Sequence, residues 1–199
     1  CIIGILSVFV LNTTTAQTGQ SIDEYLFKID SLLDLDSTRL AYEMLQQTQE
    51  QDLNSYTKSQ LIFYHKLHGD YFLMINDYEH SVEAYSPLRT LGDRDLSKQA
   101  TIWLARAIND MGISLMKVGK HIEAKEAHFI SIQLYDRFND HQGAAFNYNN
   151  LALLYQEEKN IDSALTCYSL SLEHAILAND TLGVAYNHRN LATLYADNQ

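Results

Sequence analysis

The chain is poor in the residues that turn-rich folds need. Its 199 residues include one proline and eight glycines, whereas β-sandwiches and barrels place these residues at many of their tight turns. This scarcity argues against an all-β fold. It also excludes collagen-like chains and proline-rich disordered chains.

The chain also lacks an excess of positive charge. It has 14 Lys and Arg against 25 Asp and Glu, and its net charge is −11. Nucleic-acid binding needs a basic face that neutralises phosphates, so we expect no nucleic-acid partner. Apolar residues make up 46% of the sequence, which is ordinary for a globular domain and too much for an acidic disordered tail.

Residues 1–20 differ from the rest because they contain no charged side chain. Residues 2–11 form an apolar run, too short for a membrane span of ~20 residues. Thr14 and Ala16 then provide small side chains for a cleavage site. Residues 1–20 thus resemble a secretory signal peptide truncated at its N-terminus, which predicts a secreted or periplasmic protein.

Two other interpretations of residues 1–20 stay open. The run could be the start of a buried strand or helix, or the remaining half of a longer membrane anchor. In the second case membrane association would come only through segments missing from this sequence. If Cys1 is removed with a signal peptide, Cys167 has no partner for an internal disulfide.

A repeat of about 40 residues organises the remainder of the chain. Residues 139–155 and 179–195 are identical at ten of 17 positions, where chance would give about one. Small residues recur at this spacing, and each of Gly69, Gly112 and Ala152 is followed sixteen residues later by a residue with a ring side chain. The pairs are Gly69 and Tyr85, Gly112 and His128, and Ala152 and Tyr168. These small residues are expected to let two helix backbones approach closely.

Each repeat is predicted to contain two amphipathic helices, because apolar residues recur at steps of three and four. Asn139 and Asn179 are expected to end helices in the left-handed conformation, and Asp140 and Asp180 to cap the next helices. The predicted first helices span about 22–34, 55–75, 95–118, 141–158 and 181–197. The predicted second helices span about 37–51, 78–91, 121–138 and 161–178, with ends placed to within ~2–4 residues.

This pattern resembles the tetratricopeptide repeat, in a variety with a period of about 40 residues. The fourth unit matches best, through Tyr148, Leu151, Ala152, Tyr155, Ala164 and Tyr168. The resemblance implies an all-α fold, a right-handed α-solenoid of antiparallel helix pairs, with about 4.5 repeats over residues 21–199. The last repeat is expected to be incomplete at the C-terminus, so Leu191, Leu194 and Tyr195 would face an unfilled position.

Chemistry-bearing motifs are scarce. The sequence contains no G-x-S-x-G, Walker or G-x-G-x-x-G motif. His65 and His68 lie three residues apart on a predicted helix, but a metal site needs further ligands, so we interpret them as residues of a repeat interface. We therefore predict no enzyme activity for these residues, no metal and no cofactor.

Binding is expected in the concave groove that first helices line in stacked helix pairs. The family resemblance places ligand-facing positions on those helices, at Arg106, Asn109, Asn149, Asn150, Arg189 and Asn190. Asn amides can donate to and accept from a peptide backbone, and Arg favours a ligand carboxylate. The alternative is that Asn150 and Asn190 tie neighbouring repeats together or face water.

The preferred function is an exported scaffold that binds a protein or peptide, as the sensory or docking part of a longer signalling protein. Two alternatives remain at this stage. One is a free-standing adaptor or assembly factor of the cell envelope, and the other is a set of regulatory repeats in an enzyme whose catalytic domain lies beyond residue 199.

Overall fold

The computed structural model of this chain describes residues 21–34, 37–48 and 53–196. The chain divides into two compact units, Cys1–Tyr56 and Thr57–Gln199. Residues 1–20, for which a signal peptide is predicted, lie outside the described residues. The signal peptide, and one continuous solenoid from residue 21 onwards, therefore stay predictions.

The first unit contains a helix pair, α2 (Ile22–Asp34) and α3 (Thr38–Gln47). Ser21 and Glu24 form a reciprocal capping box at the start of α2, with both hydrogen bonds at 3.1 Å. Three apolar residues of α2 and three of α3 are buried: Leu26, Ile29, Leu33, Ala41, Met44 and Leu45. This pair corresponds to the weak first repeat of the sequence.

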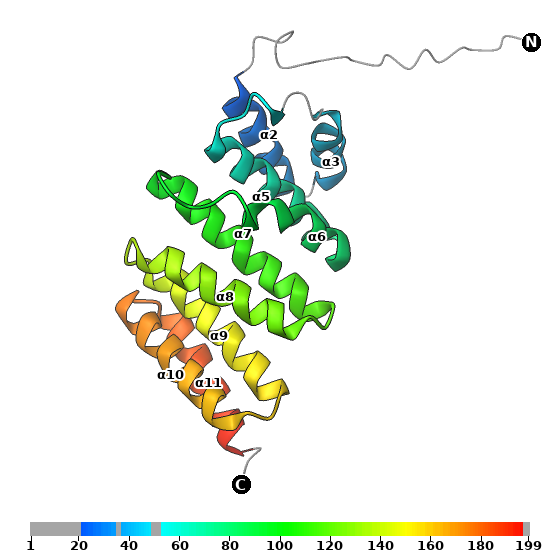
Figure 1. Cartoon of the computed structure of the whole chain (residues 1–199). Helices are drawn as coiled ribbons and strands as arrows, with labels where there is room; N and C mark the ends of the chain where they lie inside the picture. The colour runs from blue at the N-terminus through cyan, green and yellow to red at the C-terminus, as the bar shows by residue number, and fades with distance from the viewer. Residues whose placement is uncertain (1–20, 35–36, 49–52, 197–199) are drawn as a thin grey trace, which may run out of the picture. The chain divides into compact units, whose positions relative to one another are not determined.

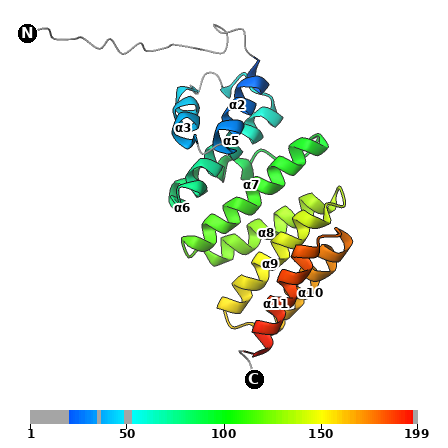
Figure 2. The ribbon, with the colours of Figure 1, turned by 180° about the vertical axis from the view of Figure 1, so that it is seen from behind.

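The second unit is a succession of antiparallel helix pairs, as Figures 1 and 2 show from opposite sides. Its elements are α5 (Lys58–Met74), α6 (Tyr78–Tyr85), the 3₁₀ helix η1 (Ser86–Arg89), α7 (Lys98–Lys117), α8 (His121–Asp136), α9 (His141–Glu157), α10 (Ile161–Leu177) and α11 (Thr181–Ala196). All secondary structure in the described residues is helical, so the predicted all-α fold of antiparallel helix pairs is confirmed.

Local signals set most of the helix boundaries. Asn139 and Asn179 are left-handed, with φ of 52° and 54°. Asp140 and Asp180 then accept hydrogen bonds from the backbone N–H three residues later, at 3.0 and 2.9 Å. These are the end and cap that the sequence predicts.

One predicted boundary is wrong. The second helix expected over residues 78–91 ends as an α-helix at Tyr85, and the chain continues in a 3₁₀ turn that contains Pro87. Proline has no N–H and its ring collides with the preceding turn, so it cannot continue an α-helix.

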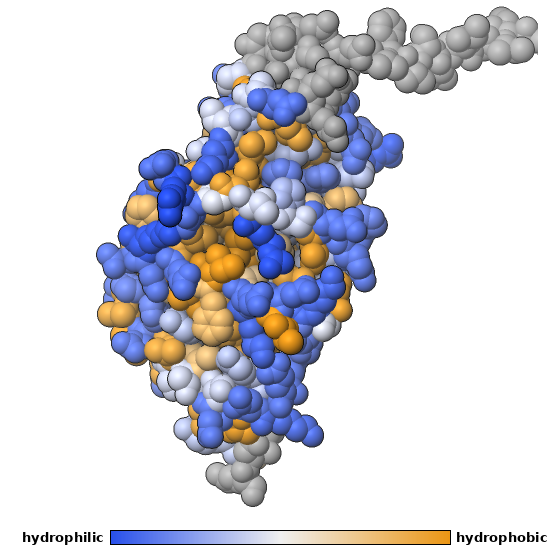
Figure 3. All heavy atoms as spheres, in the orientation of Figure 1, coloured by the Kyte–Doolittle hydropathy of each residue, from blue (hydrophilic) through white to orange (hydrophobic). Residues whose placement is uncertain are grey.

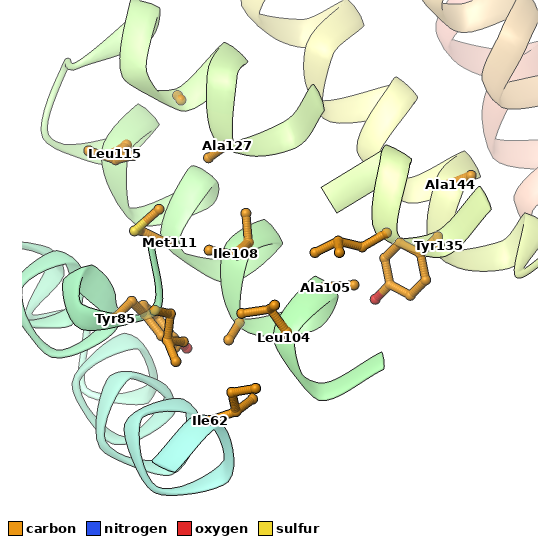
Figure 4. Packing of buried hydrophobic residues seen from close by; sticks show 14 of the residues in the cluster. Ile62, Tyr85, Leu104, Ala105, Ile108, Met111, Leu115, Ala127, Tyr135 and Ala144 are labelled. Atoms are coloured by element: carbon orange, nitrogen blue, oxygen red, sulfur yellow. The ribbon is translucent and has the colours of Figure 1, made fainter. Parts of the chain in front are cut away.

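Close approach of paired helices depends on the small residues of the repeat. A Cβ atom at Gly69 would lie 2.3 Å from the ring of Tyr85, and one at Gly112 would lie 2.7 Å from His128. The ring therefore occupies the space that a side chain would need. The helix pairs pack around this motif, and Figure 4 shows Tyr85 beside Met111 and Ile62 in the core between α5, α6 and α7.

The surface of this unit mixes polar and apolar residues. On the face shown in Figure 3, hydrophobic patches are set among hydrophilic residues. On α8, Ile122 is 72% exposed, and Phe129 and Ile130 are also exposed. No helix of the described residues is long and apolar enough to cross a membrane.

One expectation about the last helix, α11, is wrong. Leu194 was expected to face an unfilled position, but it is buried in a cluster with Leu151, Ala164 and Tyr168. The side chains of α9 and α10 thus cover this face of α11. Tyr195 is exposed, as expected.

Candidate functional site

Two neighbouring cavities lie along the first helices of the second unit. The α7–α9 cavity has a volume of about 280 Å³ and is lined by Arg106, Asn109, Asp110, Tyr135, Asp140, Gln142, Gly143, Phe146 and Asn147. The α9–α11 cavity has a volume of about 470 Å³ and is lined by Gln142, Ala145, Phe146, Asn149, Ser171, Asp180, Leu182, Gly183, Tyr186 and Asn187. Gln142 and Phe146 border both cavities, so together the two form one groove, called here the first-helix groove.

The two cavities are built from equivalent positions of the repeat. Seven lining positions of the α7–α9 cavity recur 40 residues later in the α9–α11 cavity, as the pairs Arg106 and Phe146, Asn109 and Asn149, Asp140 and Asp180, Gln142 and Leu182, Gly143 and Gly183, Phe146 and Tyr186, Asn147 and Asn187. The repetition of the sequence therefore produces a repetition of the binding surface.

The six predicted ligand-binding residues divide into two groups. Arg106 and Asn109 line the α7–α9 cavity, and Asn149 lines the α9–α11 cavity. Asn150, Arg189 and Asn190 line neither of these two cavities.

The second group makes contacts within the fold. Asn150 donates from Nδ2 to Oδ1 of Asn109 at 3.2 Å, and Asn190 donates in the same way to Asn149 at 2.8 Å. These bonds join α9 to α7 and α11 to α9, which is the alternative role that the sequence left open. That all six residues also contact a ligand stays a prediction.

Arg189 stays on the surface of α11. Its guanidinium carbon lies 4.4 Å from the centre of the Tyr186 ring, within the range of a cation–π contact. The cation therefore sits next to a wall of the α9–α11 cavity, since Tyr186 lines that cavity.

Sequence reasoning missed Asn147 and Asn187 as lining residues. Each donates from Nδ2 to the carbonyl of the glycine four residues earlier, at 2.9 Å. Both belong to the ten identities between the two repeats, so the signal was present in the sequence. Identity alone could not show that these side chains turn towards a cavity.

The electrostatics of the α7–α9 cavity centre on Asp110. Burial raises the pKa of this carboxyl to about 7, and the neighbouring carboxylate of Asp70 adds to the rise. Hydrogen bonding from Asn109 and the charges of Lys66 and Arg106 oppose it. Asp110 thus titrates near neutral pH and changes the charge of the groove there.

The pH dependence of stability tests this assignment. Because the folded carboxyl binds its proton more tightly than the unfolded one, Asp110 contributes stability at low pH that is lost as pH rises from about 4 to about 7. The parent should therefore lose unfolding free energy relative to Asp110→Asn across this window, at up to about 1.4 kcal/mol per pH unit. Urea denaturation of both proteins at several pH values measures the difference.

The comparison with Asp110→Asn is needed because His128 has the opposite effect. Burial lowers the pKa of His128 to about 4, so its contribution is lost as pH falls from 6.5 towards 4. His128 is present in both proteins, and its contribution cancels in the difference. A difference that does not change with pH would contradict the raised pKa of Asp110.

His65 and His68 are both partly buried on α5. Burial lowers the pKa of both His65 and His68. In the part of the chain that the structure describes, no group of three or more His, Cys, Asp or Glu side chains could hold a metal ion.

A family profile matches part of this chain, and several solved structures have the same fold. The sequence profile of the tetratricopeptide repeat matches residues 103–175. No curated protein matches the sequence significantly.

Solved structures with the same fold share little sequence identity with this chain. BtubC from P. vanneervenii is 15% identical, with a TM-score of 0.60 over 88% of this chain and 80% of that one. Aspartyl phosphate phosphatase F from Bacillus subtilis is 15% identical, with a TM-score of 0.64 over 84% and 43%. A signal transduction ATPase from Pyrococcus horikoshii with a tetratricopeptide repeat sensor is 12% identical, with a TM-score of 0.66 over 83% and 25%.

Tetratricopeptide repeats are protein-interaction scaffolds and are in general not catalytic. The matched residues include all of α8 and α9 and most of α7 and α10, whose helix pairs form the first-helix groove together with α11. The profile match, the packing of small residues against rings and the fold of the solved structures agree. Residues 103–175 therefore match the tetratricopeptide repeat, as the sequence predicts.

Proposed function

We propose that the first-helix groove binds an extended peptide segment of a partner protein. The observation that carries this proposal is the recurrence of equivalent lining positions in two adjacent cavities. Packed helices lie about 8–10 Å apart, and a peptide extended in the polyproline II conformation advances about 3.1 Å per residue, with side chains on the same side every three residues. Side chains about three residues apart in such a peptide would therefore enter successive cavities.

The polar groups of the groove suit a peptide backbone. Asn109 and Asn149 each carry an amide that can donate and accept, and both line a cavity. Arg106 offers a cation for a carboxylate of the ligand, with charge-assisted hydrogen bonds. Phe146, 56% exposed, gives an apolar contact at the border of both cavities.

The experiment selects ligands from a library of random short peptides on the full chain and measures their affinities by calorimetry. Phe146→Ala is expected to weaken binding about tenfold, because exposed aromatic side chains in grooves often dominate binding energy. Ile122→Ala on α8 is the matched control, since Ile122 is 72% exposed and lines neither cavity. Peptides that bind Phe146→Ala like the parent but lose affinity for Ile122→Ala would place the site elsewhere.

An exported location and a sensory or docking role in a longer signalling protein form the finer part of the proposal. The uncharged, apolar pattern of residues 1–20 supports export. The archaeal ATPase with a repeat sensor supports the second role by analogy of fold only, at 12% identity.

Export is tested by a charge in the apolar run. Residues 1–20, preceded by a start methionine, are fused to a reporter that is active only outside the cytoplasm. Leu6→Arg should abolish reporter activity, because Arg in an apolar segment costs roughly 2.5–3.5 kcal/mol on insertion. Leu6→Val is the control, and equal activity of the arginine variant would rule out a signal peptide here.

A further inference from the structure

The α9–α11 cavity lacks a wall that the α7–α9 cavity has. In the α7–α9 cavity Tyr135 of α8 lines the wall, and its ring lies where a Cβ atom of Gly143 would be, 2.4 Å away. Forty residues later Ala175 replaces Tyr135, while Gly183 retains the glycine. Ala175 ends in a methyl group, and the cavity beside Gly183 is the larger one, about 470 Å³ against about 280 Å³.

The remaining walls of the α9–α11 cavity are also more apolar. Phe146 stands where the other cavity has Arg106, and Leu182 stands where it has Gln142. Tyr186 adds a second ring at the position of Phe146 in the preceding repeat. The space is sufficient for a ring, since an apolar cavity of roughly 150 Å³ already holds benzene.

A buried acceptor borders this cavity. In the α7–α9 cavity Oδ1 of Asn147 is bonded to Nδ1 of His128 at 3.0 Å. Tyr168 takes the position of His128 in the next repeat, and its hydroxyl donates to Gln156 instead, at 2.9 Å. Asn187 is only 3% exposed, and its Oδ1 has no hydrogen-bond partner among the described residues.

We propose that the α9–α11 cavity is the specificity pocket for an aromatic side chain whose ring edge carries a donor, as in Tyr and Trp. The inference rests on the proposed peptide-binding function of the groove. The ligand ring lies in the cavity beside Gly183, next to the carboxylate of Asp180, whose Oδ2 is 2.6 Å from the position of a Cβ atom at Gly183. Phe146 and Tyr186 contact its faces or edges. Its O–H or N–H donates to Oδ1 of Asn187, which relieves an unsatisfied buried acceptor.

The first experiment uses p-cresol and 3-methylindole as stand-ins for the two side chains. Each is titrated into the full chain and followed by amide NMR, with affinity on the order of millimolar expected for ligands of this size. Shifts should occur at Gly183 and Asn187. Gly143 and Asn147 of the smaller, more polar equivalent cavity, where Tyr135 covers the glycine, are the internal control and should shift less. Toluene, which has no donor, should bind about tenfold more weakly than p-cresol.

Two variants then test the pocket itself. Ala175→Tyr copies the tyrosine of the preceding repeat onto Gly183 and should abolish binding of p-cresol, whereas Ala192→Tyr on the exposed side of α11 should leave it unchanged. Because Ala175 is fully buried, Tyr186→Ala provides a second test without a change to the core. It should weaken binding about three- to tenfold, as expected for the loss of one aromatic contact.

The outcomes separate this pocket from the groove. The pocket assignment would be wrong if Gly143 and Asn147 shifted as much as Gly183 and Asn187, or if toluene bound as tightly as p-cresol. It would also be wrong if neither Ala175→Tyr nor Tyr186→Ala changed the binding of p-cresol. If p-cresol fails to bind while selected peptides still respond to Phe146→Ala, the pocket is wrong and the peptide groove stands. If the selected peptides bind the Phe146→Ala variant as tightly as the parent, the proposed function itself is wrong.

Discussion

Tyr85→Ala is expected to lower the free energy of unfolding of the second unit by about 3–5 kcal/mol, the range for loss of a large buried ring. The side chain is 0% exposed and lies in the core with Ile62 and Met111 (Figure 4). Its ring fills the gap over Gly69, where a Cβ atom would be 2.3 Å away. Alanine at this position leaves a cavity between α5 and α6, because the helix backbones cannot collapse fully into the space.

The hydroxyl of Tyr85 contributes separately. It donates to Oδ1 of Asp70 at 2.5 Å, and burial raises the pKa of the hydroxyl well above its usual value, so it stays a donor at neutral pH. Tyr85→Phe keeps the ring and removes the donor, so we expect a smaller loss of about 1–3 kcal/mol.

Urea denaturation of the full chain, followed by circular dichroism, measures these two losses. Tyr195→Ala is the matched control: Tyr195 is 58% exposed, and its removal should change stability by less than about 0.5 kcal/mol. A Tyr85→Ala protein as stable as the parent would show that α5 and α6 do not pack through this ring.

Gly143→Ala and Gly183→Ala should have different effects although the two glycines are equivalent in the repeat. A methyl group at Gly143 would lie 2.4 Å from the ring of Tyr135, which is buried. We expect a loss of about 1–3 kcal/mol from overpacking. At Gly183 the nearest atom is a carboxylate oxygen of Asp180, at 2.6 Å, and Ala175 follows at 3.3 Å.

The carboxylate of Asp180 can rotate at the cost of part of its capping hydrogen bond from the Gly183 N–H, whereas alanine favours a helix over glycine by up to about 1 kcal/mol. Gly183→Ala should therefore change stability by about 1 kcal/mol or less, in either direction. Both variants are compared with the parent by urea denaturation.

A double substitution provides the control for the ring. If Tyr135 is the obstacle, Tyr135→Ala should suppress part of the effect of Gly143→Ala, with an interaction energy of about 0.5–3 kcal/mol. Equal losses at Gly143 and Gly183, or strict additivity with Tyr135→Ala, would contradict the packing described for α8 and α9.

The sequence predicted only part of the candidate site correctly. Arg106, Asn109 and Asn149 were selected from the positions of the repeat, and they do line the two cavities. Asn150 and Asn190 were selected by the same rule, but their amides bond to Asn109 and Asn149 on the neighbouring first helices. Each bond spans 41 residues, and its existence depends on how closely two helices pack.

The sequence by itself determined the helices, their pairing and their period. Signals such as Asn139 followed by Asp140 act over three or four residues, and the size of Gly112 against His128 fixes which faces meet. Only the tertiary structure decided the openings between helices and the charge near them. The α9–α11 cavity is larger than the α7–α9 cavity, and Asp110 acquires a raised pKa, because free volume and desolvation arise from several packed helices at once.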